Sequence, residues 1–137
     1  MNSTCNSMPK TMDVARILII DDDYSIRKIL RLLLEREGYD VFEAPDGDVG
    51  LKIQEAESVD LVITDIFMPE KEGLETILEF KTGLIDIKII AISGGGLRGT
   101  DPNLVLGIAK EMGADRILNK PISVKNLLET VSEILTS

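Results

Sequence analysis

The sequence contains no histidine, and this absence removes two familiar classes of site. Without imidazole there is no histidine general base and no histidine-ligated zinc within these 137 residues. The single cysteine, Cys5, has no partner for an intramolecular disulfide, which is consistent with a reducing compartment. Any chemistry in this sequence therefore depends on carboxylates and lysine.

Long apolar runs and an excess of basic residues are also missing. No run reaches the roughly 18 residues of a membrane span, and the first dozen residues contain no hydrophobic signal segment. We therefore expect a cytoplasmic protein without membrane contact. Asp and Glu number 24 against 15 Lys and Arg, which gives a net charge of -9. This charge argues against direct binding to nucleic acid and favours a cation or a basic protein patch as partner.

The length and composition fit one domain. Of the 137 residues 44% are hydrophobic, which is enough for a single core. Residues 1–13 show no periodicity and are expected to form a disordered arm. The domain itself is expected to span residues 14–137.

Apolar strands alternate with helical patterns five times along the domain. The expected strands cover 17–20, 40–44, 61–64, 87–92 and 116–119, and each is followed by residues at helical spacing. This order predicts a doubly wound α/β fold with one parallel sheet and right-handed crossovers. In the helix expected over 47–57, we predict that Val49, Ile53 and Ala56 face inward.

A polar residue follows most of these strands. Asp21 and Asp22 follow the first, Asp65 the third, Ser93 the fourth and Lys120 the fifth. Because ligands of open α/β sheets bind beyond the carboxyl ends of the strands, we expect these side chains to meet at one edge.

Three carboxylates in one place need a counter-charge. At about 4 Å and an effective dielectric near 20, each pair repels by roughly 4 kcal/mol. An oxygen-only ligand set selects a hard cation, and a partly open set suits Mg²⁺ better than Ca²⁺. The alternative for each residue is structural: Asp21 to Asp23 only cap a helix, Ser93 caps or forms a turn, and Lys120 lies on the surface.

Together, the segments IDDD, TDIFMPEKEG and LNKP on five βα units resemble the response-regulator receiver domain, the CheY-like module of two-component signalling. The resemblance covers about residues 14–136. It implies the flavodoxin-like strand order 2-1-3-4-5, a histidine kinase or phosphotransfer protein as phosphate donor, and an unknown downstream protein as partner.

The resemblance also implies roles for individual residues. Asp65 matches the phosphorylated aspartate, and Asp22 and Asp65 match the direct ligands of Mg²⁺. Asp21 matches a residue that acts mainly through water, and the main-chain carbonyl of Phe67 supplies a further ligand.

Ser93 matches the hydroxyl that moves onto the phosphoryl group, and Lys120 matches the residue that pairs with that group. The bond from Lys120 to Pro121 is often cis in the family. Relatives carry an aromatic switch residue on the fifth strand, whereas this sequence has Ile117 at that position.

Parts of the sequence are also compatible with three other functions. A haloacid-dehalogenase-type phosphohydrolase would use Asp21 as nucleophile, but it needs an acidic pair after the lysine, for which only Glu129 and Glu133 are available. Residues 94–99 match the dinucleotide fingerprint G-x-G-x-x-G, but they follow the fourth strand instead of the first. A flavin carrier is disfavoured because the first loop is acidic.

Overall fold

Strands and helices alternate without exception in the computed structural model, which describes residues 14–66, 73–83, 87–93 and 101–136. The arm expected over residues 1–13 lies outside the described residues. In chain order the elements are β1 (Arg16–Ile20), α1 (Tyr24–Arg36), β2 (Asp40–Ala44), α2 (Gly47–Glu57), β3 (Leu61–Asp65), α3 (Gly73–Gly83), β4 (Lys88–Ser93), α4 (Pro102–Met112), β5 (Arg116–Asn119) and α5 (Val124–Thr136).

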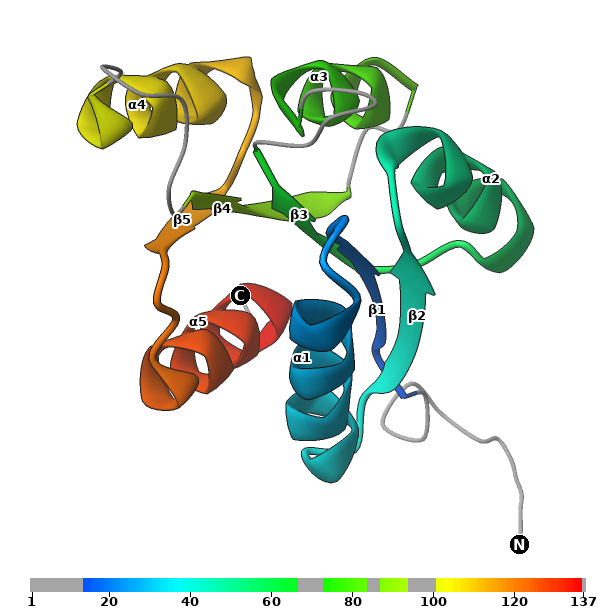
Figure 1. Ribbon diagram of the computed structural model, residues 1–137. Helices are drawn as coiled ribbons and strands as arrows, with labels where there is room; N and C mark the ends of the chain where they lie inside the picture. Colours follow the sequence, from blue (N-terminus) through cyan, green and yellow to red (C-terminus); the bar gives the residue numbers. More distant parts are fainter. Residues whose placement is uncertain (1–13, 67–72, 84–86, 94–100, 137) are drawn as a thin grey trace, which may run out of the picture.

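The five strands form one parallel sheet in the order β2-β1-β3-β4-β5 (Figure 1). Ile17 of β1 lies opposite Val41 on one side and Leu61 on the other, and the central strands are buried on both faces. Because both faces of the sheet are covered, the strands are continuous apolar runs in the sequence. The predicted doubly wound α/β fold and its strand order 2-1-3-4-5 are confirmed.

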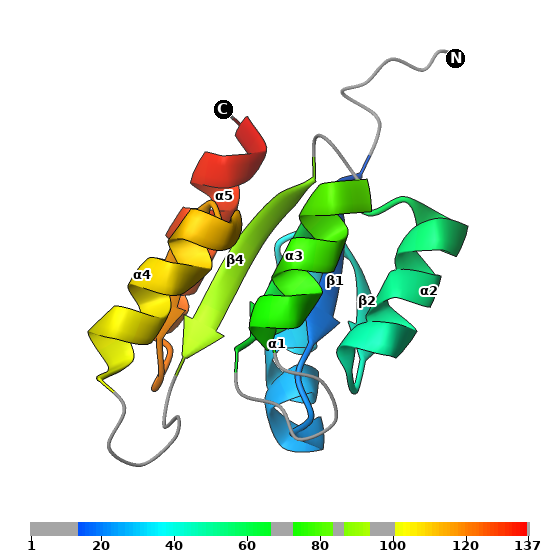
Figure 2. The same ribbon diagram turned by 90° about the horizontal axis from the view of Figure 1, so that it is seen from above.

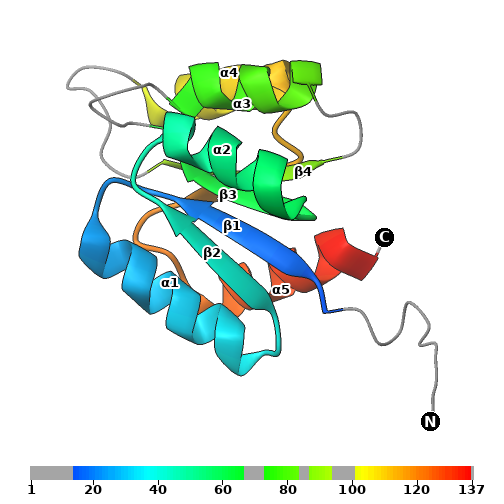
Figure 3. The same ribbon diagram turned by 90° about the vertical axis from the view of Figure 1, so that its right-hand side faces the viewer.

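Helices cover the sheet in two layers. α1 and α5 lie on one face, and α2, α3 and α4 lie on the other (Figures 1 and 3). Each face has its own core: Leu30 and Leu127 belong to the first, and Phe80 and Ala109 to the second. None of the helices in the described part of the chain is long and apolar enough to cross a membrane.

Caps fix where several helices begin and end. Asp23, Asp46 and Asp101 are the N-caps of α1, α2 and α4, and each side chain accepts hydrogen bonds from main-chain N–H groups of the first turn. Gly38 and Gly113 follow α1 and α4 with φ of 95° and 129°, a conformation that favours glycine.

One prediction about α2 was wrong. Ala56 is exposed, while Gly50 and Gln54 are buried on this helix. A Cβ atom at Gly50 would lie 2.6 Å from Cδ1 of Ile20, so the missing side chain is what allows α2 to approach β1 so closely. Gln54 is buried because its amide oxygen accepts a hydrogen bond of 2.8 Å from the main-chain N–H of Val59. Hydropathy alone places neither residue inward.

Candidate functional site

The polar residues that follow the strands lie at the same edge of the sheet. The arrowheads of β1 and β4 point toward this edge (Figure 2). Asp21 directly follows β1, Asp65 ends β3, Ser93 ends β4 and Lys120 directly follows β5. The predicted convergence therefore follows from parallel strands that share one direction.

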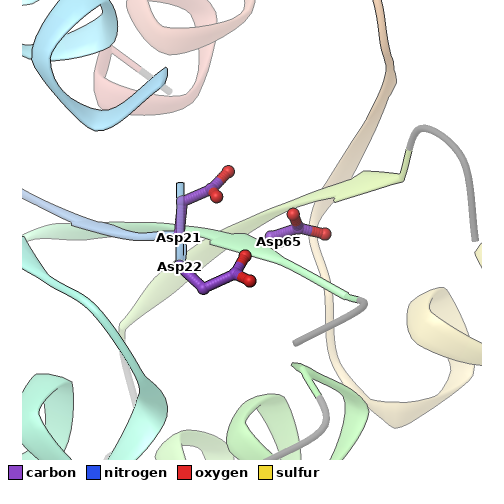
Figure 4. A group of neighbouring side chains, drawn as sticks. All are labelled: Asp21, Asp22 and Asp65. Carbon is purple, nitrogen blue, oxygen red and sulfur yellow. The ribbon is translucent and has the colours of Figure 1, made fainter. Parts of the chain in front are cut away.

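Three carboxylates form the centre of this site. Asp21, Asp22 and Asp65 each offer one oxygen, and these oxygens lie within 4.8 Å of one another (Figure 4). Asp21 and Asp65 are buried, with 1% and 6% of their surface exposed, whereas Asp22 is exposed. Oxygen donors at this spacing, open to solvent on one side, fit a hard divalent cation such as Mg²⁺.

Asp21 is held by its neighbours on several sides. Its Oδ1 accepts a hydrogen bond of 2.8 Å from the N–H of Asp23, and its own N–H donates to the carbonyl of Ala44 on β2 at 3.2 Å. Burial raises the pKa of the Asp21 carboxyl; the Asp23 N–H opposes that rise, the charge of Asp65 adds to it, and Lys120 opposes it. Of Asp21, Asp22 and Asp23, only Asp23 is the N-cap of α1. Helix capping therefore does not explain why Asp21 and Asp22 are present.

Lys120 connects two of the carboxylates. Its Nζ lies 3.0 Å from Oδ2 of Asp65 and 3.3 Å from Oδ2 of Asp21. Burial lowers the pKa of the Lys120 ammonium, but the hydrogen bond and charge of Asp65, followed by those of Asp21, outweigh this effect and leave the pKa raised. Lys120 is therefore a charge partner of the site and is not a surface lysine. Its peptide bond to Pro121 is cis.

Ser93 is buried, and its carbonyl accepts a hydrogen bond of 2.8 Å from the N–H of Lys120. Ile117 lies opposite Ala91 of β4, is partly buried, and packs against the core beneath α3 and α4. The sequence-based positions for Phe67 and for the glycine-rich residues 94–99 lie outside the described residues.

Sequence reasoning missed Arg27 beside the acidic site. Nη1 of Arg27 donates a hydrogen bond of 2.7 Å to the main-chain carbonyl of Asp21, and its Nε lies 3.2 Å from Oε1 of Glu43. Side chains of a helix lean toward its N-terminus, so an arginine one turn into α1 can reach the preceding loop. That spacing makes the contact with the loop possible, but it does not by itself distinguish Arg27 from a solvated arginine.

The chain matches the response regulator receiver domain family over residues 17–132. It belongs to this family. It is 34% identical to the alkaline phosphatase synthesis transcriptional regulatory protein PhoP of Bacillus subtilis, over 88% of this chain and 48% of the relative. It is also 34% identical to the CAI-1 autoinducer sensor kinase/phosphatase CqsS of Vibrio cholerae, over 96% of this chain and 19% of that relative.

Solved receiver domains have the same fold. A CheY-like receiver domain protein from Methanospirillum hungatei superposes with a TM-score of 0.82 at 31% identity, over 90% of this chain and 95% of that one. The chain spans about half the length of the transcriptional regulators that it matches.

Receiver membership does not favour the phosphohydrolase alternative. Of the two glutamates that it would need, both are exposed on α5, and Glu133 pairs with Arg116 at 2.9 Å. Arg116 is the first residue of β5, so Glu133 lies near the amino-terminal ends of the strands, at the edge of the sheet opposite the three aspartates.

Proposed function

We propose that this receiver domain accepts a phosphoryl group on Asp65 from a phosphohistidine of a histidine kinase or phosphotransfer protein, in a Mg²⁺-dependent reaction in the cytoplasm. The observation that carries the proposal is the position of Lys120, whose Nζ lies 3.0 Å from Asp65 and 3.3 Å from Asp21 beside a third carboxylate. Transfer of a phosphoryl group requires positive charge near its oxygens, which Lys120 and a cation held by the acidic cluster would provide.

The reaction assigns one task to each side chain. A carboxylate oxygen of Asp65 attacks phosphorus as the phosphorus–nitrogen bond of the donor breaks and the imidazole leaves. Mg²⁺, when bound by Asp21, Asp22 and Asp65, supplies positive charge for the phosphoryl oxygens. Lys120 supplies a second positive charge, and the hydroxyl of Ser93 donates a hydrogen bond to the new group. The main-chain carbonyl of Phe67 is proposed as a further metal ligand.

The donor requires a docking surface close to Asp65. An apolar hollow of about 250 Å³ opens next to Lys120, between α1 and the start of α5. Ile29 and Val124 line it with 57% and 48% of their surface exposed, although their helical spacing is that of core residues. We assign this hollow to the phosphohistidine-bearing protein, because a partner seated there lies beside the lysine that contacts Asp65.

The signal is proposed to leave through the face formed by α4, β5 and α5. Leu104 and Ile108 of α4 are 60% and 40% exposed and offer an apolar contact to a downstream protein. The switch is proposed to run through Ser93, since Ile117 provides no aromatic ring to reorient.

Incubation with acetyl phosphate and Mg²⁺, followed by mass-spectrometric mapping of the modified residue, tests the assignment. We expect label on Asp65, no label in Asp65→Asn, and retained label in Asp23→Asn, because asparagine is an equally good N-cap. Label on Asp21, together with turnover of a phosphomonoester, would instead establish the phosphohydrolase.

A further inference from the structure

Arg27 bridges the acidic loop to strand β2. Its guanidinium donates from Nη1 to the carbonyl of Asp21 at 2.7 Å and from Nε to Glu43 at 3.2 Å. The side chain is only 13% exposed, and that of Glu43 only 10%. The bridge is therefore a partly buried, charge-assisted contact, which is a stronger kind of hydrogen bond than a surface pair.

The carbonyl held by Arg27 belongs to the peptide group that joins Asp21 to Asp22. On the other side of Asp21, its N–H donates to the carbonyl of Ala44 at 3.2 Å. The backbone is thus fixed on both sides of the residue that contributes the buried carboxylate. The orientation of this peptide also determines where Asp22, the exposed member of the cluster, directs its carboxylate (Figure 4).

Glu43 holds Arg27 in this position. Its second oxygen, Oε2, accepts from Nζ of Lys28 and from Nη1 of Arg31, each at 2.9 Å. Three cations on α1 therefore meet one carboxylate on β2, and only Arg27 extends from it to the acidic loop. Lys28 and Arg31 form no hydrogen bond or ion pair with Asp21 or Asp22 in the described part of the chain, which makes Lys28 a suitable control.

We propose that Arg27 is a positioning residue for cation binding by Asp21 and Asp22. The inference rests on the proposed function, since it assumes that the three aspartates bind Mg²⁺. A positioning role and a purely electrostatic role of Arg27 predict opposite effects of its removal on the affinity for Mg²⁺. Loss of a nearby positive charge strengthens the attraction for a dication, whereas loss of the hydrogen bond to the Asp21 carbonyl loosens the ligands and weakens binding.

Calorimetric titration of the unphosphorylated protein with MgCl₂ separates these effects. We expect Arg27→Met to raise the dissociation constant about tenfold, the lower end for loss of a residue that orients metal ligands. Arg27→Lys keeps the charge but replaces the two donor atoms Nε and Nη1, held in a rigid fork, by one nitrogen on a flexible side chain, so we expect a similar loss. Lys28→Met removes one charge from the same cluster without affecting Asp21, and we expect binding within about twofold of wild type or slightly tighter.

Unchanged or tighter binding by Arg27→Met would overturn the inference, as would full wild-type affinity in Arg27→Lys. Urea unfolding without Mg²⁺ verifies that each titrated variant is folded, and Arg27→Lys remains the test if Arg27→Met does not fold. A different outcome would show that the proposed function itself is wrong: the wild-type protein would not bind Mg²⁺, or Asp22→Asn would bind Mg²⁺ with wild-type affinity.

Discussion

Replacing Glu43 with glutamine is expected to remove a pH-dependent part of the stability of this domain. Glu43 lies near the end of β2, and its side chain contacts Arg27, Lys28 and Arg31 at 3.2, 2.9 and 2.9 Å. Glutamine keeps the shape and an acceptor oxygen but loses the charge. The three cations on α1 then lose their shared counter-ion at a site that is 10% exposed.

The size of the effect follows from the pKa of Glu43. Burial raises this pKa, but the hydrogen bonds from Arg31, Lys28 and Arg27 prevail and lower it from 4.5 to about 2. A carboxyl with a lowered folded-state pKa stabilises the fold above its unfolded pKa, and that contribution is lost as the pH falls toward the folded value. Linkage gives about 3 kcal/mol at pH 7, about 2 kcal/mol at pH 3.5 and about 1 kcal/mol at pH 2.5.

Urea unfolding followed by circular dichroism at several pH values measures this difference between wild type and Glu43→Gln. Other carboxyls titrate in both proteins and cancel in the comparison. Glu35→Gln is the matched control, because Glu35 pairs with Arg31 at 3.0 Å while 42% exposed, and a surface pair contributes about 0–1 kcal/mol. A Glu43→Gln penalty no larger than that of Glu35→Gln, or one that stays constant from pH 7 to pH 3.5, would refute the reasoning.

Three further outcomes are expected. Gly50→Ala should destabilise by about 1–3 kcal/mol in urea unfolding, because the new Cβ would meet Cδ1 of the fully buried Ile20. Gly107→Ala should stabilise by up to about 1 kcal/mol, because a Cβ there would point into open space. Equal effects of the two substitutions would contradict the packing argument. Ile29→Asp should slow phosphotransfer from a phosphohistidine protein and leave labelling by acetyl phosphate unchanged, and loss of both would contradict the docking surface. Mg²⁺ at a hundred times its dissociation constant should add about 2.7 kcal/mol of stability, seen as a raised Tm in wild type but not in Asp22→Asn; an unchanged wild-type Tm would count against the cation site.

The fold and the strand-end residues could be predicted because they depend on local patterns. Runs such as Ile17 to Ile20 are buried on both faces, and one shared strand direction brings Asp21, Asp65 and Lys120 to one edge. These features need only hydropathy, spacing and the geometry of parallel sheets.

The parts that could not be predicted depend on contacts between elements. Ala56 was expected to face inward but is exposed, and Gly50 is buried instead because the close approach of α2 to β1 leaves no room for a side chain there. Ile29 has the periodicity of a core residue but is 57% exposed beside the hollow next to Lys120. Arg27 was missed because its partners lie in a loop and on another strand, and a charged residue on a helix is usually solvated.

A count of charges connects the geometry of the site to its proposed chemistry. Asp21, Asp22 and Asp65 bring three negative charges, and Lys120 returns one, so the cluster carries -2. At an effective dielectric near 20, the attraction of the lysine to each of its two partners is about 5 kcal/mol, while two carboxylate oxygens no more than 4.8 Å apart repel by at least about 3 kcal/mol. Lys120 therefore outweighs the mutual repulsion of the two buried aspartates, but the cluster keeps a net charge of -2 and is open to solvent at exposed Asp22. One divalent cation on that open side neutralises the remainder, and a phosphoryl group on Asp65, which adds about one further negative charge, requires both cations together.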